Sequence, residues 1–232
     1  MQRYYPLVIV DDLSTLELSG ELSHHLGTVR RLRVGTTLFA TDGQGHVRSV
    51  QVTAVRPAVV LESVSPIETV DKPEPEIGIA MFIPSNERLA WAIQKLTEIG
   101  VDRIDLLGDD GDRRGGSKIS AAGMGRLKRI AREAAQQSER LWLPDINPPS
   151  EVRDYFHVER PGLAILDPEG GPLLGDVTTL LVGPESGVFT SPSSIPRVSL
   201  GLPILRIETA AVAGGVILAA LRASLICICD KF

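Results

Sequence analysis

The pattern of hydrophobic and polar positions changes character near residue 70. Before that point the apolar residues fall in short runs rich in valine, leucine and threonine, which is typical of strands joined by tight turns. Asp42-Gly43-Gln44-Gly45 is such a turn. We expect strands at 29–38, 47–55 and 58–64. Short strands at this spacing favour a small β-barrel or sandwich.

From residue 77 onward, strand patterns alternate with helical ones. Apolar residues recur at helical spacing over 87–99, which ends at Gly100, and over the basic segment 121–137. The last apolar stretch, 210–225, predicts a core helix that starts near Glu208. Strands are expected at 77–83, 101–107, 163–166, 180–182 and 198–200, of which 163–166 and 180–182 are short and fully apolar. Such alternation favours an α/β fold with a mostly parallel sheet covered on both faces.

A charged segment with two prolines, 70–76, separates the two patterns and is typical of a linker. The chain of 232 residues is long enough for two modest cores. We therefore predict a small β-domain at 1–72 and an α/β domain at 73–232.

The net charge of −5 does not by itself favour a nucleic-acid-binding protein, but the basic residues are clustered. Residues 113–140 hold eight lysines and arginines against two glutamates, and Arg30, Arg31 and Arg33 form a second cluster. Binding to phosphates follows the local field and not the total charge. The basic stretch therefore indicates either a surface that contacts nucleic-acid phosphates or a solvated helix face.

Several other kinds of chemistry are disfavoured. Cys227 and Cys229 are too close in sequence for an unstrained bridge, and no histidine cluster accompanies them, so we expect no metal site. The chain has no G-x-G-x-x-G after a strand and no P-loop lysine motif, which argues against a nucleotide-dependent metabolic enzyme. It shows no signal-peptide pattern, so we expect a cytoplasmic protein.

Two glycine-containing turns follow apolar strands near the end of the chain. The strand 180–182 runs into Gly183-Pro184-Glu185-Ser186-Gly187, and the strand 198–200 runs into a loop that leads to Glu208 and Thr209. In open α/β sheets, ligands bind at the carboxyl ends of strands. Each turn alone could be a tight connection, and Glu208 and Thr209 could simply cap a helix. Two such turns in succession favour a shared ligand pocket.

Four motifs occur in the order found in one known family. They are His25-Leu26 with Val29, Arg31 and Gly35; Gln94-Lys95-Leu96-Thr97-Glu98-Ile99-Gly100-Val101; Arg132-Glu133-Ala134-Ala135-Gln136-Gln137-Ser138 with Arg140 and Pro144; and Gly183-Pro184-Glu185-Ser186-Gly187 with Leu200-Gly201 and Leu205-Arg206-Ile207-Glu208-Thr209-Ala210. Over nearly its whole length the chain resembles the SPOUT methyltransferases. Within them it resembles the bacterial family that methylates a uridine at N(3) in 16S ribosomal RNA.

The resemblance implies a trefoil-knotted C-terminal α/β domain after a PUA-like β-barrel that binds RNA. It also implies a homodimer that acts on 16S rRNA, with the assembled small subunit as the substrate and S-adenosylmethionine as the cofactor. The implied cofactor-binding residues are Leu166, Leu181, Val182, Gly183, Pro184, Glu185, Ser186, Gly187, Leu200, Gly201, Leu205 and Thr209. The implied RNA-binding residues are Arg31, Arg132, Gln137 and Arg140.

The implied reaction needs help from side chains, because the imide nitrogen of uridine carries a proton. A base or a polarising cation must help form the anion. The candidates are Glu208 as the proton acceptor, and Arg206 or Arg140 as the cation that stabilises the negative charge developing on the uracil oxygens.

Departures from the family pattern leave alternatives open. Ser186 stands where the family usually has a glycine, and the acidic residue usual after this turn is replaced by Ser191-Pro192-Ser193-Ser194. A related enzyme that methylates ribose 2′-hydroxyls or tRNA is one alternative. A non-catalytic RNA-binding factor for ribosome assembly is another.

Overall fold

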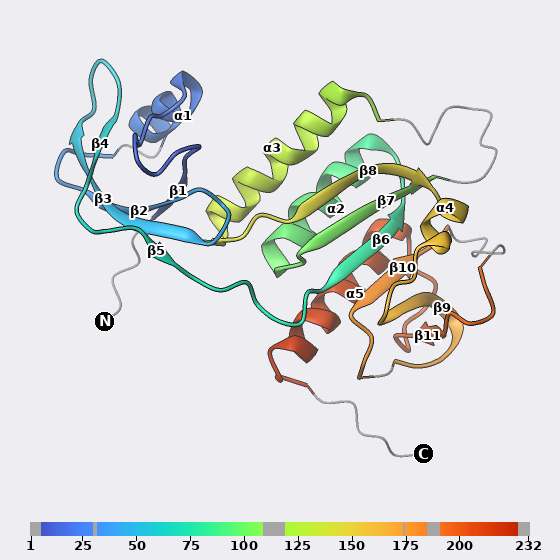
Figure 1. Cartoon of the computed structure of the whole chain (residues 1–232). Helices are drawn as coiled ribbons and strands as arrows, with labels where there is room; N and C mark the ends of the chain where they lie inside the picture. The colour runs from blue at the N-terminus through green and yellow to red at the C-terminus, as the bar shows by residue number, and fades with distance from the viewer. Residues whose placement is uncertain (1–5, 30–31, 109–118, 174, 185–190, 227–232) are drawn as a thin grey trace. The chain divides into compact units, whose positions relative to one another are not determined.

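The computed structural model describes residues 6–29, 32–108, 119–173, 175–184 and 191–226 (Figure 1). By contacts, the chain divides into two compact units. The first unit comprises Met1–Lys72 and Ala135–Leu143, and the second comprises Pro73–Ala134 and Pro144–Phe232. A segment far along the sequence therefore belongs to the N-terminal unit.

The first unit is built on a five-stranded mixed sheet. Its strands are β1 (Leu7–Ile9), β2 (Thr37–Thr41), β3 (His46–Ala54), β4 (Val60–Ser63) and β5 (Glu68–Thr69). They run in the order β1-β2-β3-β4, and β5 also pairs with β3. Only the β1–β2 pair is parallel. One helical stretch, α1 (Gly20–His24) continued by the π-helical η1 (His25–Val29), buries Leu26 in the core of this unit.

The predicted strand at 29–38 is wrong. The start of that segment is the end of η1, and β2 begins only at Thr37. Between them the chain turns, because the Thr36 amide donates to the Arg33 carbonyl at 3.0 Å and Gly35 takes a φ of +88°. The other two expected strands correspond to β3 and β4 with small shifts at their ends.

The turn before β3 holds the distant segment of the first unit. Gly45 has a φ of +86°, and a Cβ atom there would lie 2.3 Å from the Trp142 ring. The Trp142 indole donates a hydrogen bond to the Val70 carbonyl at 3.1 Å, and the Gly45 amide donates to the Leu141 carbonyl at 2.9 Å. Glycine is required here both for its backbone conformation and for the close approach of the indole.

The second unit is built on a six-stranded sheet in the order β11-β9-β10-β6-β7-β8, in which every neighbouring pair is parallel. Its strands are β6 (Gly78–Phe82), β7 (Arg103–Gly108), β8 (Asp145–Glu151), β9 (Leu163–Pro172), β10 (Thr179–Val182) and β11 (Arg197–Ser199). The predicted parallel sheet is confirmed. The sequence analysis missed β8, which contains two consecutive prolines and lies at the edge of the sheet.

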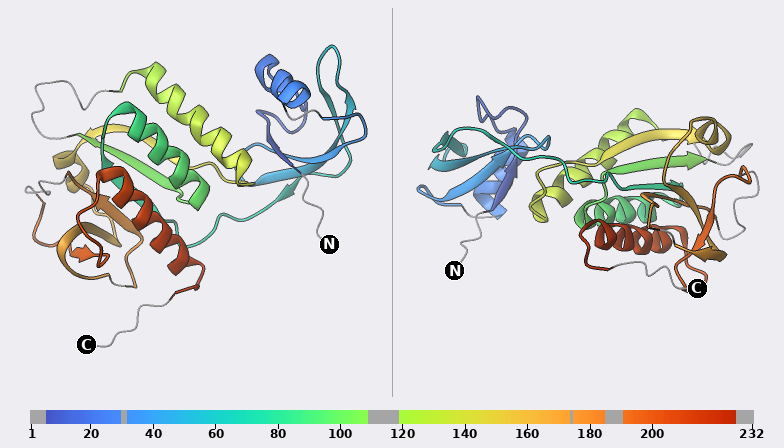
Figure 2. Two further views of the ribbon diagram at one scale, coloured as in Figure 1. Left: turned by 180° about the vertical axis from the view of Figure 1, so that it is seen from behind. Right: turned by 60° about the horizontal axis from the view of Figure 1, so that its bottom comes forward.

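Helices cover both faces of this sheet (Figure 2). Ile79 and Met81 of β6 face the core formed with α2 (Asn86–Ile99), α5 (Ile207–Arg222) and α3 (Ala121–Gln137). The alternate residues Ala80 and Phe82 face the core of α4 (Val152–His157). This two-sided burial explains why β6 is apolar at every position. No helix in the described part of the chain is long and apolar enough to cross a membrane.

A buried ion pair fixes the end of α5 to the start of β7. Asp102 is fully buried, pairs with Arg222 and accepts the Ile77 amide at 3.1 Å. Arg222 also donates to the Gly100 carbonyl at 2.9 Å, at the turn that follows α2. Charged and backbone hydrogen bonds therefore join α2, α5 and the sheet at one point.

Candidate functional site

The first glycine-containing turn leaves the sheet at the carboxyl end of β10. Val182, the last residue of β10, pairs in register with Leu166 of the neighbouring parallel strand β9. Gly183 and Pro184 follow directly and are half-buried. Glu185, Ser186 and Gly187, which the sequence analysis assigned to the same turn, lie outside the described residues. Leu166, Leu181 and Val182 thus belong to adjoining strands at one part of the sheet.

The second turn leaves the sheet on the other side of β9. β11 is parallel to β9 and ends at Ser199, so Leu200 and Gly201 emerge at the same edge of the sheet as Gly183. Gly201 has a φ of +67°, and apart from its two chain neighbours no atom of the described residues lies within 4 Å of the position of a Cβ there. Its amide donates to the Ser199 hydroxyl at 3.1 Å. The backbone of this turn is therefore open to a ligand.

An ion pair secures β11 beside this edge. Arg197, the first residue of β11, donates to Asp167 at 2.7 Å, and Asp167 directly follows Leu166. The hydrogen bond from the Glu169 amide, and then that from Arg197, hold the pKa of Asp167 below its ordinary value. Arg197 also contacts the Ser191 hydroxyl at 2.9 Å. The second turn is therefore anchored to the strand that carries Leu166.

The second turn leads into the N-terminus of α5. Leu205, like Leu166, is partly buried and packs against the apolar cluster that contains Val182. Arg206 is the N-cap residue, with extended φ and ψ of −66° and 154°, and its side chain is exposed. Glu208, in the first helical turn, is buried, whereas Thr209 is exposed. The predicted residues Arg206, Glu208 and Thr209 therefore lie together at one helix end.

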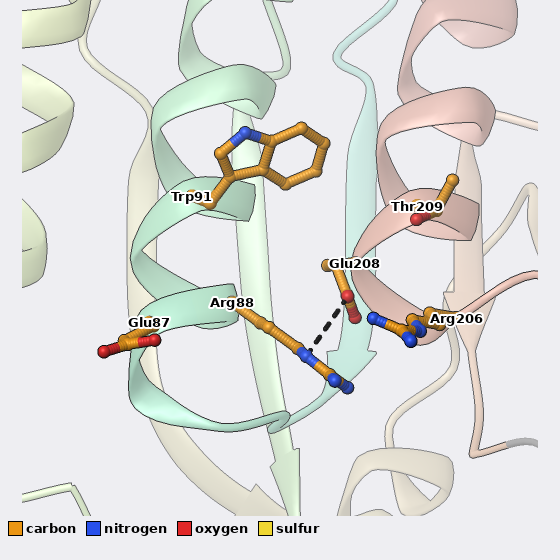
Figure 3. Close-up of a pocket in the computed structure, with 6 residues that line it drawn as sticks. All are labelled: Glu87, Arg88, Trp91, Arg206, Glu208 and Thr209. Carbon is orange, nitrogen blue, oxygen red and sulfur yellow. Dashed lines mark ion pairs between the residues drawn. The ribbon is translucent and has the colours of Figure 1, made fainter.

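These three residues line a cavity of about 350 Å³ between α2 and α5 (Figure 3). The remaining lining residues come from α2 and are Glu87, Arg88 and Trp91. The Arg88 guanidinium lies 3.5 Å from a Glu208 carboxylate oxygen, Oε1. The other oxygen, Oε2, is buried and has no hydrogen-bond partner among the described residues. Sequence reasoning missed Arg88 and Trp91, because their position depends on the packing of two helices far apart in sequence.

The remaining predicted residues are divided between the two units. Arg132 is half-buried in the part of α3 that belongs to the second unit. Gln137 is exposed, Arg140 is half-buried, and both belong to the first unit. Arg31 lies outside the described residues, as do Arg113, Arg114 and Lys118 of the basic stretch. Within the described ranges, no group of three or more His, Cys, Asp or Glu side chains is arranged to hold a metal ion.

Comparison with known families gives two matches along the chain. Residues 71–219 match the model of an RNA methyltransferase domain, and residues 18–61 match that of an RNA methyltransferase PUA domain. The chain is 30% identical over 230 residues to ribosomal RNA small subunit methyltransferase E of a Synechocystis strain. That alignment covers 89% of this chain and 74% of the relative.

Solved structures give the same result for the fold. A probable rRNA methyltransferase from Porphyromonas gingivalis matches with a TM-score of 0.78 at 26% identity and covers 95% of this chain and 100% of that one. A methyltransferase from Legionella pneumophila, solved in complex with the cofactor SAM, matches with a TM-score of 0.77 at 25% identity. This match covers 95% of this chain and 98% of the other. The expected fold class, an α/β domain preceded by a PUA-like domain, is confirmed.

Proposed function

Because the chain belongs to the RNA methyltransferase family, we propose that it transfers a methyl group from S-adenosylmethionine to the N(3) nitrogen of a uridine in 16S ribosomal RNA. The observation that carries the proposal is the grouping of Arg206, Glu208 and Thr209 in one cavity at the N-terminus of α5. The turn that leads into this helix leaves the sheet at the same edge as the turn that follows β10.

The residues at this edge suit the cofactor. An adenine ring needs apolar walls and close access to backbone polar groups. Leu166 and Leu205 are partly buried and pack against the apolar cluster that contains Val182, and the open backbone at Gly201 allows a ligand to approach closely. We assign the adenosine part of the cofactor to these residues, to Leu181, Gly183, Pro184 and Leu200 beside them, and, from the sequence alone, to Glu185, Ser186 and Gly187. When bound, the cofactor supplies a methyl group activated by its sulfonium sulfur.

The side chains at the N-terminus of α5 activate the uridine for methylation. The Oε2 atom of Glu208 has no partner among the described residues, so it is free to accept the N(3) proton of uracil. Arg206 is exposed beside it and stabilises the negative charge that then develops on the uracil oxygens. Thr209 contributes a hydroxyl at the rim of the same cavity. From the sequence alone we also propose Arg140, a residue of the first unit, as a stabilising cation, and its own variant tests that role.

RNA binding is assigned to basic and polar side chains of both units. Arg132 on α3, with Gln137, Arg140 and Arg31, contacts phosphates, which provide affinity without sequence information. We assign residues 1–72 to a PUA-like RNA-binding domain and 73–232 to the methyltransferase domain. The protein acts in the cytoplasm as a homodimer on the assembled small subunit.

The test is methylation of small subunits taken from a strain that lacks this enzyme. Nucleosides are analysed by mass spectrometry, and formation of 3-methyluridine supports the proposal. Arg206→Ala should abolish turnover while the protein stays folded, and Arg140→Ala should slow it. Arg153→Ala, which removes an exposed arginine from α4, should leave the rate unchanged. Formation of a 2′-O-methylated nucleoside instead, or normal turnover by Arg206→Ala, would reject the assignment.

A further inference from the structure

The α2 side of the cavity has no role in the reaction as described so far. Arg88 and Trp91 line it opposite Arg206 and Glu208 (Figure 3). The cavity, at about 350 Å³, lies at the small end of the range for small-molecule sites. It is therefore large enough for a ligand of about the size of one nucleotide. The chemistry of its lining determines what kind of ligand that is.

Glu208 indicates that the ligand donates a hydrogen bond. Its side chain is only 10% exposed, and the Oε2 atom has no partner among the described residues. The separation of 3.5 Å between Oε1 and the Arg88 Nε atom exceeds the usual length of an N–H···O hydrogen bond. A buried carboxylate that lacks hydrogen-bond donors raises the free energy of the folded protein. A ligand that donates a hydrogen bond from an N–H group to Oε2 removes that free-energy penalty.

The cations around Glu208 indicate that the same ligand is also negatively charged. The Arg88 side chain is 46% exposed, and in Figure 3 the side chains of Arg88 and Arg206 both extend toward Glu208. The N-terminus of α5, a helix of 16 residues, adds backbone amides and the positive end of the helix dipole. Glu87, the other acid of the lining, points away from Glu208 in Figure 3.

Trp91 indicates that the ligand contains a flat ring. The residue is 43% exposed on α2, and its indole extends toward α5 above the ion pair (Figure 3). An exposed indole beside arginines is the kind of surface on which proteins stack the bases of single-stranded nucleic acids.

We infer that this cavity binds the target uridine, with its ring on Trp91, its N(3)–H directed at Glu208 Oε2, its uracil oxygens facing Arg206 and its phosphate held by Arg88. A free anion would leave Oε2 without a donor, and an uncharged ring would leave Arg88 without an anion to bind. A uridine nucleotide provides a partner for Trp91, for Glu208 and for each of the two arginines. The inference rests on the proposed function, since it gives Glu208 the role of proton acceptor, and it adds Arg88 and Trp91 as substrate-binding residues.

Tryptophan fluorescence tests the inference directly, because the chain has two tryptophans, at positions 91 and 142. In a Trp142→Phe variant, titration with uridine 5′-monophosphate should quench the remaining indole in a saturable way. In a Trp91→Phe variant, the same titration should leave the fluorescence unchanged. Cytidine 5′-monophosphate, which has no N(3) proton, should bind more weakly than the uridine nucleotide. Inorganic phosphate and uridine alone should each bind more weakly as well.

Calorimetry of the full-length variants with the same nucleotide extends the test. Trp91→Ala should weaken binding by about 5- to 150-fold, the range for loss of one base–aromatic stack. Arg88→Ala should also weaken it, Arg88→Lys should restore part of the affinity, and Arg153→Ala should have no effect. The affinity for S-adenosylmethionine should be the same in all four variants.

The inference would be overturned by an absence of quenching of Trp91 or by unchanged nucleotide affinity in Trp91→Ala. A loss of affinity confined to S-adenosylmethionine would overturn it too, because it would assign the cavity to the cofactor. Conversion of a dimer to a monomer by Trp91→Ala, seen by light scattering, would assign this face to a second copy of the chain and would also overturn it. Absence of S-adenosylmethionine binding in the wild-type protein rejects the proposed function instead. The nucleotide titration can still be interpreted in that case.

Discussion

Replacement of Arg222 by methionine should destabilise the second unit by about 3–5 kcal/mol, because it leaves the fully buried Asp102 carboxylate without its cation. Methionine keeps much of the apolar stem, so the loss comes from the charge and from the hydrogen bond to the Gly100 carbonyl. The part-exposed ion pair of Lys95 and Glu98 on α2 serves as a comparison for the contribution of an ion pair to stability. Its side chains are 35% and 29% exposed, and such a pair contributes only about 0.2–0.5 kcal/mol.

Urea denaturation measures this difference, with Trp91 as the reporter in a Trp142→Phe background. Asp102→Asn keeps an oxygen for the Ile77 amide, so the double variant Asp102→Asn/Arg222→Met should lose less than the sum of the two single losses. The expected coupling energy is about 0.5–3 kcal/mol. A loss below about 1 kcal/mol for Arg222→Met, or an equal loss for Lys95→Met, would refute the reasoning.

Three further predictions concern other parts of the chain. Gly45→Ala, which places a Cβ 2.3 Å from the Trp142 ring at a φ of +86°, should cost the first unit about 2–5 kcal/mol in urea denaturation. Gly35→Ala, at a φ of +88° with open space around it, should cost only about 1–2 kcal/mol. Because the pKa of Asp167 is lowered, its ion pair stabilises the second unit above about pH 4 and is lost as the pH falls through the lowered pKa. The stability difference between wild type and Asp167→Asn should therefore shrink between about pH 7 and about pH 3, and a constant difference would contradict this. Arg132→Ala should lower the salt dependence of rRNA binding by about one unit of slope, and an unchanged slope would remove Arg132 from the RNA surface.

The elements that the sequence predicted well are those whose burial follows one simple period. The segment 87–99 has apolar residues at helical spacing and forms α2, and the uniformly apolar 77–83 contains β6. The sequence analysis predicts no strand at 145–151, where β8 lies. Prolines disfavour a central strand, and β8 accommodates two of them because it lies at the edge of the sheet.

The candidate site also divides into features that the sequence predicts and features that depend on tertiary packing. The Gly183 and Gly201 turns could be found from sequence, because a strand followed by glycine is a local signal. The contact between Arg88 and Glu208 could not, since it requires α2 and α5 to pack side by side on the same face of the sheet. A single sequence gives no local sign of a pairing that tertiary packing creates.

The membership of Ala135–Leu143 in the first unit has a consequence for how the protein is made. A nascent chain that has emerged only as far as Lys72 lacks Trp142. It therefore lacks the indole that packs against Gly45. The N-terminal unit therefore cannot reach its final packing during translation until the ribosome has synthesised more than half of the polypeptide. For the same reason, a fragment that ends at the linker should be less stable than the corresponding part of the intact protein.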